Sequence, residues 1–206
     1  MTKTFYIIDD HEMLRLGTSG WLTSNSDWKC CGSAGTHETA FADFKRLAGE
    51  GALPLLAICD LNFYGENTGF DFMSKIHELY PDVKIIVYSM FFASGIVQSA
   101  LKSGASGYVS KNASCAELLN CMEKVLAGET FIQKELESNL IKYKNFTDAL
   151  TRREKEVMEL LLRRCSNDEI ANQLGIKKRA VENYISLIYE KTGINDRNEL
   201  LARYGQ

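Results

Sequence analysis

The first 127 residues alternate short apolar runs with amphipathic segments, and this alternation restricts the fold more than any other feature of the chain. The apolar runs lie at Thr4–Asp9, Lys29–Ala34, Leu55–Asp60, Val83–Tyr88 and Gly107–Val109. The amphipathic segments after them are Met13–Ser24, Thr39–Ala48, Gly69–Leu79, Ile96–Lys102 and Cys115–Leu126. The third and fourth runs are almost continuously apolar, as strands covered by helices on both faces must be. The pattern predicts a doubly wound α/β domain with five parallel strands.

The alternation stops after Gly128, and the rest of the chain carries helical patterns only. Residues 129–147 are mixed and weakly helical without a strand signal, so we expect a linker over 128–147. Beyond it the pattern predicts four helices, at Thr151–Arg163, Asn167–Leu174, Lys178–Lys191 and Asp196–Tyr204. The tight turn Leu174-Gly175-Ile176 indicates a helix-turn-helix. We therefore expect one domain over 1–127 and a small all-α domain over 148–206.

Charge and hydropathy exclude several classes of protein. The chain has 24 Lys and Arg against 27 Asp and Glu, so any binding of nucleic acid must be local. No apolar run approaches the ~18 residues of a transmembrane helix, and the run Phe5–Ile8 ends at two aspartates, too early for a signal peptide. We expect a cytoplasmic protein without membrane contacts. The six cysteines contain no C-x-x-C pair, and we interpret them as reduced thiols.

Polar residues follow four of the five expected strands. Asp9 and Asp10 end the first, Asp60 the third, Ser89 the fourth, and Lys111 follows the fifth. Ligands of open parallel sheets bind beyond the carboxyl ends of the strands, so we expect these side chains to share one pocket. Crowded carboxylates favour a divalent cation, most plausibly Mg²⁺, and one of them can then act as the nucleophile of a phosphoryl transfer. We expect the neighbouring His11 to lie beside this pocket rather than to bind the metal.

These residues resemble the receiver domain of bacterial two-component response regulators. The resemblance spans residues 1 to about 127 and rests on Asp9-Asp10-His11, Arg15, Gly17, Asp60-Leu61, Ser89 and Gly107-Tyr108-Val109-Ser110-Lys111. It implies a flavodoxin-like fold in which Asp60 is the phosphoacceptor. One difference lies in the loop after Asp60, which lacks the family's usual proline four residues on and reaches its second glycine nine residues on instead of eight.

The same resemblance implies roles for the other matching residues. The Mg²⁺ ligands would be Asp10, Asp60 and the backbone carbonyl of Asn62, with Asp9 completing the acidic pocket. The groups that respond to the phosphoryl group would be the Ser89 hydroxyl, the Lys111 ammonium and Tyr108 as the aromatic switch. The family also implies a sensor histidine kinase as partner.

The second domain concentrates positive charge where a helix begins. Lys177-Lys178-Arg179 stands at the start of the third helix, where the helix dipole also favours phosphate. In a helix-turn-helix this second helix of the pair enters the major groove of DNA. The residues expected to contact DNA are Lys177, Lys178, Arg179, Glu182, Asn183 and Ser186. Two interpretations of Glu182 stay open: it accepts a hydrogen bond from cytosine N4, or it faces solvent or pairs with Lys178.

Residues 148–204 closely resemble the LuxR-type DNA-binding domain, and the whole chain resembles a response regulator of the NarL/FixJ class. The matching strings are Leu150–Val157, Ser166–Ala171, Leu174–Ile176, Val181–Ile185 and Ile188–Lys191. In that family the third helix reads DNA and the fourth supplies a dimer contact. We expect a homodimer on two half-sites, joined through the final helix, where Leu200, Leu201 and Tyr204 form a short apolar stripe after Ile194, unless these residues pack inside the monomer.

Three functions compete for this sequence. The first is a transcription regulator that a sensor histidine kinase switches by phosphorylating Asp60. The second is an aspartate-nucleophile phosphatase, but such enzymes carry a second aspartate two residues after the first, and position 62 is asparagine. The third is a DNA-binding protein with a degenerate receiver that serves protein contacts only, independent of phosphorylation. The sequence favours the first, a regulator rather than an enzyme.

Overall fold

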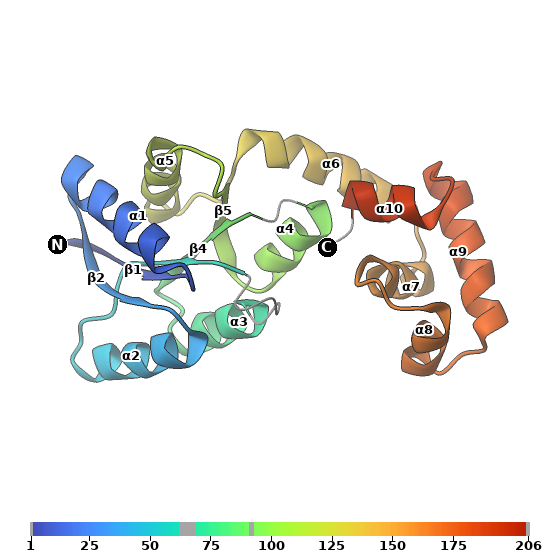
Figure 1. Ribbon diagram of the computed structural model, residues 1–206, viewed down its shortest axis with the longest axis horizontal. Helices are drawn as coiled ribbons and strands as arrows, with labels where there is room; N and C mark the ends of the chain where they lie inside the picture. Colours follow the sequence, from blue (N-terminus) through green and yellow to red (C-terminus); the bar gives the residue numbers. More distant parts are fainter. Residues whose placement is uncertain (1, 62–68, 91–92, 205–206) are drawn as a thin grey trace. The chain divides into compact units, whose positions relative to one another are not determined.

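The computed structural model describes residues 2–61, 69–90 and 93–204, without the side chains of 138, 139, 142–146 and 202–204 (Figure 1). Asn62, the expected source of a backbone carbonyl for the metal, lies outside the described residues. The chain divides into two compact units. The first comprises Met1–Phe92 and Ser99–Gln133, and the second Ala93–Gln98 and Lys134–Gln206.

The described part of the first unit is built on a parallel sheet with the strand order β2-β1-β3-β4-β5-β6. Its strands are β1 Lys3–Ile8, β2 Trp28–Ala34, β3 Leu56–Cys59, β4 Lys84–Ser89, β5 Ala105–Ser110 and β6 Phe131–Ile132. All five expected strands are present. The expectation that 129–147 contains no strand is wrong at Phe131–Ile132, because β6 adds a short sixth strand beside β5.

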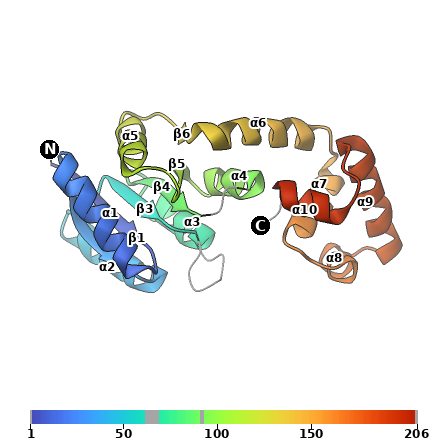
Figure 2. The same ribbon diagram turned by 45° about the horizontal axis from the view of Figure 1, so that its top comes forward.

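Helices cover both faces of this sheet, which confirms the doubly wound fold (Figure 2). They are α1 Glu12–Asn25, α2 His37–Gly49, α3 Gly69–Leu79, α4 Ser94–Lys102 and α5 Cys115–Leu126. Successive residues of a strand point to opposite faces. Phe5 and Ile7 therefore join the buried cluster that includes residues of α1 and α5, while Tyr6 packs edge-on against Phe44 of α2.

Tyr6 also determines the backbone of the outermost strand. Its hydroxyl donates to Asp43 Oδ2 of α2 at 2.6 Å, so the buried ring keeps a polar partner. The same ring lies against Gly32 of β2, where a Cβ atom would come within 2.6 Å of it. Glycine is therefore the residue that fits here. The pairing of β1 with β2 shifts its register between Phe5 and Tyr6, which leaves an irregularity in the edge strand.

The second unit is helical. Its helices among the described residues are α6 Lys134–Asp148, α7 Arg152–Leu162, α8 Asn167–Leu174, α9 Lys178–Thr192 and α10 Arg197–Tyr204. Ser166 caps α8 with a reciprocal pair of hydrogen bonds to Glu169, and Gly175 ends that helix at φ +63°, a left-handed conformation that suits glycine. The expected helix-turn-helix is therefore present as α8 and α9. Nowhere in the described part of the chain does a helix have the length and apolar character needed to span a bilayer.

An ion pair between a buried glutamate and a partly exposed lysine joins the ends of two helices in this unit. Glu154 of α7 is 3% exposed and accepts hydrogen bonds from Lys191 Nζ at 2.8 Å and from the Thr151 backbone N–H at 2.6 Å. The hydrogen bond from Lys191 is the main cause that lowers the pKa of Glu154, with smaller contributions from Thr151. A lowered carboxyl pKa stabilises the folded state above the ordinary pKa of about 4.5, and this contribution is lost as the pH falls through the folded value.

Glu154→Gln should therefore destabilise the protein by about 1–3 kcal/mol at pH 7, because the charged acceptor of two hydrogen bonds is lost. The difference from the wild type should shrink as the pH falls below 4.5 toward the lowered pKa of Glu154, because protonation then removes the charged acceptor. Thermal unfolding at pH 7 and pH 4 measures both effects. Glu159→Gln, at an exposed position of the same helix, is the matched control and should leave the melting temperature within a degree or two. An equal loss for both variants would contradict this role of Glu154.

Candidate functional site

The ends of β1, β3, β4 and β5 meet at one edge of the sheet. Asp9 follows β1, Asp60 follows β3, Ser89 ends β4 and Lys111 follows β5. Backbone hydrogen bonds hold these ends in register, from Asp60 N–H to the Ile8 carbonyl and from Lys111 N–H to the Ser89 carbonyl, both at 2.9 Å. The parallel register, rather than any contact between side chains, therefore brings these polar residues to the same edge.

Lys111 joins two of the carboxylates. Its Nζ lies 2.6 Å from Asp9 Oδ2 and 2.6 Å from Asp60 Oδ2, and its side chain is 5% exposed. The other oxygen of Asp60, Oδ1, accepts the backbone N–H of Leu61 at 2.7 Å. Burial lowers the pKa of Lys111, but the hydrogen bonds to Asp60 and Asp9 and their charges outweigh it and raise that pKa above its ordinary value. Lys111 is therefore a charged group held against the carboxylate expected to react.

Asp10 and His11 complete the acidic end of the pocket. His11 Nδ1 lies 2.7 Å from Asp10 Oδ1 and 3.3 Å from Asp9 Oδ1. Ligand atoms of Asp9, Asp10 and His11 all fall within 4.8 Å of one another. Carboxylate oxygens are the donors that hard divalent cations prefer, so the donor set fits such a cation. His11 was expected beside the pocket, and its ring nitrogen lies against both carboxylates while its side chain is largely exposed.

Ser89 and Tyr108 are fully buried near this edge, in β4 and β5. Burial is the main cause that raises the pKa of Tyr108, and the charge of Asp60 raises it further. The ring therefore stays protonated and, in this structure, lies inside the fold.

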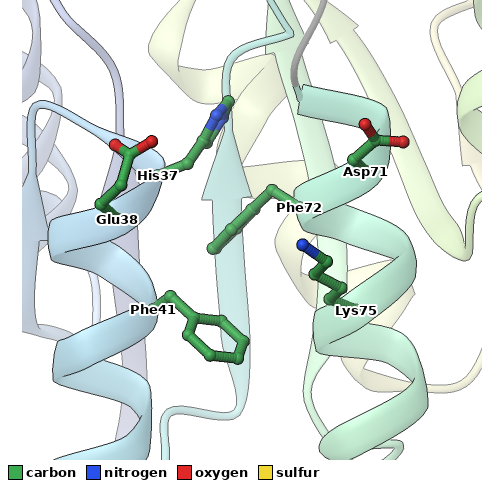
Figure 3. Close-up of a pocket in the computed structure, with 6 residues that line it drawn as sticks. All are labelled: His37, Glu38, Phe41, Asp71, Phe72 and Lys75. Carbon is green, nitrogen blue, oxygen red and sulfur yellow. The ribbon is translucent and has the colours of Figure 1, made fainter.

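A hollow of about 410 Å³ lies between α2 and α3 (Figure 3). The ring of His37 stacks on that of Phe72 with 5.0 Å between ring centroids. Burial lowers the pKa of His37, and the charges of Glu38 and Asp60 oppose this. The lining residues are His37, Glu38, Phe41, Asp71, Phe72 and Lys75. The hollow is lined by none of the residues expected to take part in phosphoryl transfer.

The expected DNA-contacting residues lie on one exposed side of α9. Val181 and Ile188 of the same helix are buried in the domain core. The exposed residues are Lys177, Lys178, Arg179, Glu182, Asn183 and Ser186. Lys178 Nζ forms an ion pair at 2.8 Å with Asp168 Oδ2 of α8, whereas a pairing of Lys178 with Glu182 was one of the alternatives that the sequence left open. The ion pair of Lys178 therefore links the two helices of the helix-turn-helix, a contact between residues ten positions apart.

The apolar stripe expected to join two subunits is largely internal. Ile194 and Leu200 are 3% and 0% exposed and belong to the buried core of the second unit. A small helical domain has to bury such residues to be stable. Leu201 is half-buried, and the side chain of Tyr204 lies outside the described residues. The expected contact is therefore wrong for Leu200 of the stripe and for Ile194 before it, and Leu201 is the partly exposed residue of the stripe among the described side chains.

Sheet, acidic pocket and helix-turn-helix define a receiver domain followed by a DNA-binding domain. Residues 5–123 match the family described as "Response regulator receiver domain", and residues 148–203 match "Bacterial regulatory proteins, luxR family". The chain belongs to the two-component response regulators that carry a LuxR-type DNA-binding domain. It is thus a DNA-binding transcription regulator by family.

Known relatives match over nearly the whole chain. The transcriptional regulatory protein DesR of Bacillus subtilis is 32% identical over 200 residues, which cover 97% of this chain and 95% of DesR. The response regulator protein VraR of Staphylococcus aureus is 28% identical over 206 residues, 97% of this chain and 94% of VraR. A solved complex of the response regulator RcsB with DNA shares the fold at a TM-score of 0.71 and 21% identity, with 98% of both chains covered.

Proposed function

We propose that a sensor histidine kinase phosphorylates this protein at Asp60 and that phosphorylation increases its affinity for DNA. The observation that supports this most strongly is the buried Lys111 ammonium, which lies 2.6 Å from Asp60 and from Asp9. A charged lysine at this place can hold the incoming phosphoryl oxygens. Because the proposed target is DNA, the protein would work in the cytoplasm.

The chemistry assigns a task to each group of the pocket. An oxygen of the Asp60 carboxylate attacks phosphorus, a P–O bond forms, and the bond between phosphorus and the donor nitrogen of the kinase histidine breaks with its electron pair staying on nitrogen. The ammonium of Lys111 and the hydroxyl of Ser89 then hold phosphoryl oxygens. Asp10 and Asp60, with Asp9 completing the acidic pocket, would bind Mg²⁺, which neutralises charge on the transferred group when it is present.

Acetyl phosphate supplies the direct test. Incubation with acetyl phosphate and MgCl₂ should add one phosphoryl group to the intact mass of the chain, and EDTA should prevent it. The phosphorylated protein should then bind a promoter duplex more tightly than the untreated protein. Absence of the added group, together with unchanged DNA affinity, would favour the alternative in which the receiver serves protein contacts only.

The arrangement of α9 predicts two kinds of contact with DNA. Lys178→Ala should weaken binding evenly across sequences and reduce the slope of log affinity against log salt by about one, because a phosphate contact is lost. Asn183→Ala should cost ~1–3 kcal/mol at one base position, since Asn183 is expected to face a base edge. Titrations of duplex variants at several salt concentrations separate the two effects. Lys155→Ala, at an exposed position of α7, serves as the control. A changed sequence preference in Lys178→Ala alone would contradict this division.

We further propose that the DNA-bound form is a homodimer on two half-sites. A single helix-turn-helix offers few basic side chains for tight binding at physiological salt. Leu201→Asp should therefore turn a complex of two chains per duplex into one chain per duplex and lower the affinity, as sedimentation on a two-half-site duplex would measure. Asn198→Ala, at an exposed position of the same helix, is the control and should leave the stoichiometry and the affinity unchanged. Two chains per duplex with undiminished affinity in Leu201→Asp would exclude α10 as the contact.

A further inference from the structure

The chain that leaves the receiver domain is hydrogen-bonded directly to the strand that carries the expected switch. In β6, Phe131 and Ile132 pair with Gly107 and Tyr108 of β5. The next residue, Gln133, donates its backbone N–H to the Tyr108 carbonyl at 3.0 Å. Three consecutive residues before the second unit are thus attached to the segment that ends at Lys111.

Gln133 also contacts β5 through its side chain. Its Oε1 accepts the backbone N–H of Ser110 at 2.9 Å, and Gln133 is 9% exposed. If β6 were one residue longer, a backbone carbonyl would accept the Ser110 N–H instead, and the chain would continue as a strand. The side-chain oxygen satisfies the Ser110 N–H while the backbone turns into α6 at Lys134. Gln133 is therefore the last residue of the sheet edge and the one before a helix.

The end of β5 is held from two sides. On one side β4 binds it, through the pairing of Ser89 with Ser110 and the hydrogen bond from Lys111 N–H to the Ser89 carbonyl. On the other side Gln133 binds Tyr108 and Ser110. A displacement of Ser89 or Lys111 toward a phosphoryl group pulls on the segment between them. Such a displacement must stretch or carry along the hydrogen bonds to Gln133.

A continuous helix follows Gln133. α6 runs over 15 residues from Lys134 to Asp148, which at 1.5 Å per residue is about 22 Å. It ends two residues before Leu150, a buried core residue of the second unit. Gln133 therefore stands directly before the first residue of α6, in the unit that also contains the DNA-binding helices.

We infer that Gln133 couples the phosphorylation state of the receiver to the DNA-binding domain. Its hydrogen bonds to Tyr108 and Ser110 would transmit a displacement of these two residues to α6. This inference rests on the proposed function. Gln133 is a positioning residue, since it acts through the backbone of β5 and contacts no reacting atom. Its two hydrogen bonds, to the backbone of Tyr108 and of Ser110, connect the start of α6 to β5. Neither bond involves a side chain that would hold the phosphoryl group.

Two variants of similar size test the side-chain hydrogen bond. Gln133→Met keeps the length of the side chain and removes the acceptor, whereas Gln133→Glu keeps an oxygen that can accept the Ser110 N–H. The measured quantity is the ratio of DNA affinities with and without acetyl phosphate, together with the extent of labelling by intact mass. Gln133→Met should take up the phosphoryl group like the wild type, but its ratio of DNA affinities should be at least about fivefold lower than that of the wild type. Gln133→Glu should recover most of it, and the exposed Glu137→Gln should match the wild type.

The outcomes separate this inference from the proposed function. An unchanged ratio in Gln133→Met, or the same loss in Gln133→Glu, would overturn the coupling role while leaving Asp60 phosphorylation intact. A wild-type chain that takes up no phosphoryl group would instead overturn the proposed function, and the inference with it. If Gln133→Met does not fold, hydrogen exchange of the wild-type chain decides. Phosphorylation should then alter exchange over residues 131–137, and a change confined to the segment around Ser89 would overturn the inference.

Discussion

Asp60→Asn is expected to abolish phosphoryl incorporation from acetyl phosphate, with labelling reduced at least ~100-fold at equal protein concentration. The amide is nearly isosteric with the carboxylate but lacks the anionic oxygen that attacks phosphorus. The variant should still fold, because an amide oxygen can accept the Leu61 N–H that Asp60 Oδ1 accepts in the wild type. Intact mass after incubation with acetyl phosphate and MgCl₂ measures the effect.

Two other carboxylates serve as controls for that experiment. Asp71→Asn replaces an exposed acid of α3 and should label like the wild type. Asp10→Asn should label, but only at higher Mg²⁺ concentration, because it removes an expected metal ligand and leaves the nucleophile in place. Undiminished labelling of Asp60→Asn would show that another residue accepts the phosphoryl group. Loss of labelling in Asp71→Asn would point to general damage instead.

Lys111→Ala is expected to have the largest effect on stability. It would leave the buried carboxylates of Asp9 and Asp60 without the ammonium that lies 2.6 Å from each. Loss of one partner from a buried charged cluster costs about 3–5 kcal/mol, because the remaining charges stay away from water. Urea denaturation at pH 7 measures this loss. Added Mg²⁺ should stabilise the variant more than the wild type, since a cation bound by the carboxylates replaces the missing positive charge.

The same variant tests the role of Lys111 in signalling. Chains of Lys111→Ala that take up the phosphoryl group should bind DNA no more tightly than unphosphorylated chains, because the cation that would hold the phosphoryl oxygens is absent. Lys75→Ala, at an exposed position of α3, should change neither stability nor the response to phosphorylation. Wild-type stability in Lys111→Ala, or a full increase in DNA affinity on phosphorylation, would contradict the assignment.

Most strands and helices could be predicted from the sequence, because their apolar residues recur at the spacing of a strand or a helix. Strands such as β3 and β4 are buried on both faces, so each appears as an apolar run, and the helices between them show one apolar face. The polar residues at the strand ends could also be predicted, because parallel strands place their carboxyl ends at one edge. β6 could not be found in this way. Two residues, Phe131 and Ile132, are too few to show a period, and their pairing depends on β5 being exposed at that edge.

Contacts between distant residues explain the remaining differences. Lys178 pairs with Asp168 across the turn of the helix-turn-helix, whereas helical spacing alone suggests Glu182. Leu200 shows the spacing of an exposed stripe but packs into the core that α7 and α9 provide. Gln133 carried no signal in the sequence, because its importance comes from the N–H of Ser110, 23 residues earlier. In each case tertiary packing, rather than local pattern, determines the partner.

The two edges of the receiver sheet have a consequence for how copies of this protein can associate. A long, regular edge strand is a template onto which another chain can add a strand and from which aggregates grow. At one edge, β2 is made irregular by the register shift opposite Phe5 and Tyr6 and carries the exposed Lys29. At the other, β6 ends after two residues at the side chain of Gln133. Both edges thus interrupt the regular row of backbone groups onto which a strand of another copy could add, which disfavours edge-to-edge association of receiver sheets.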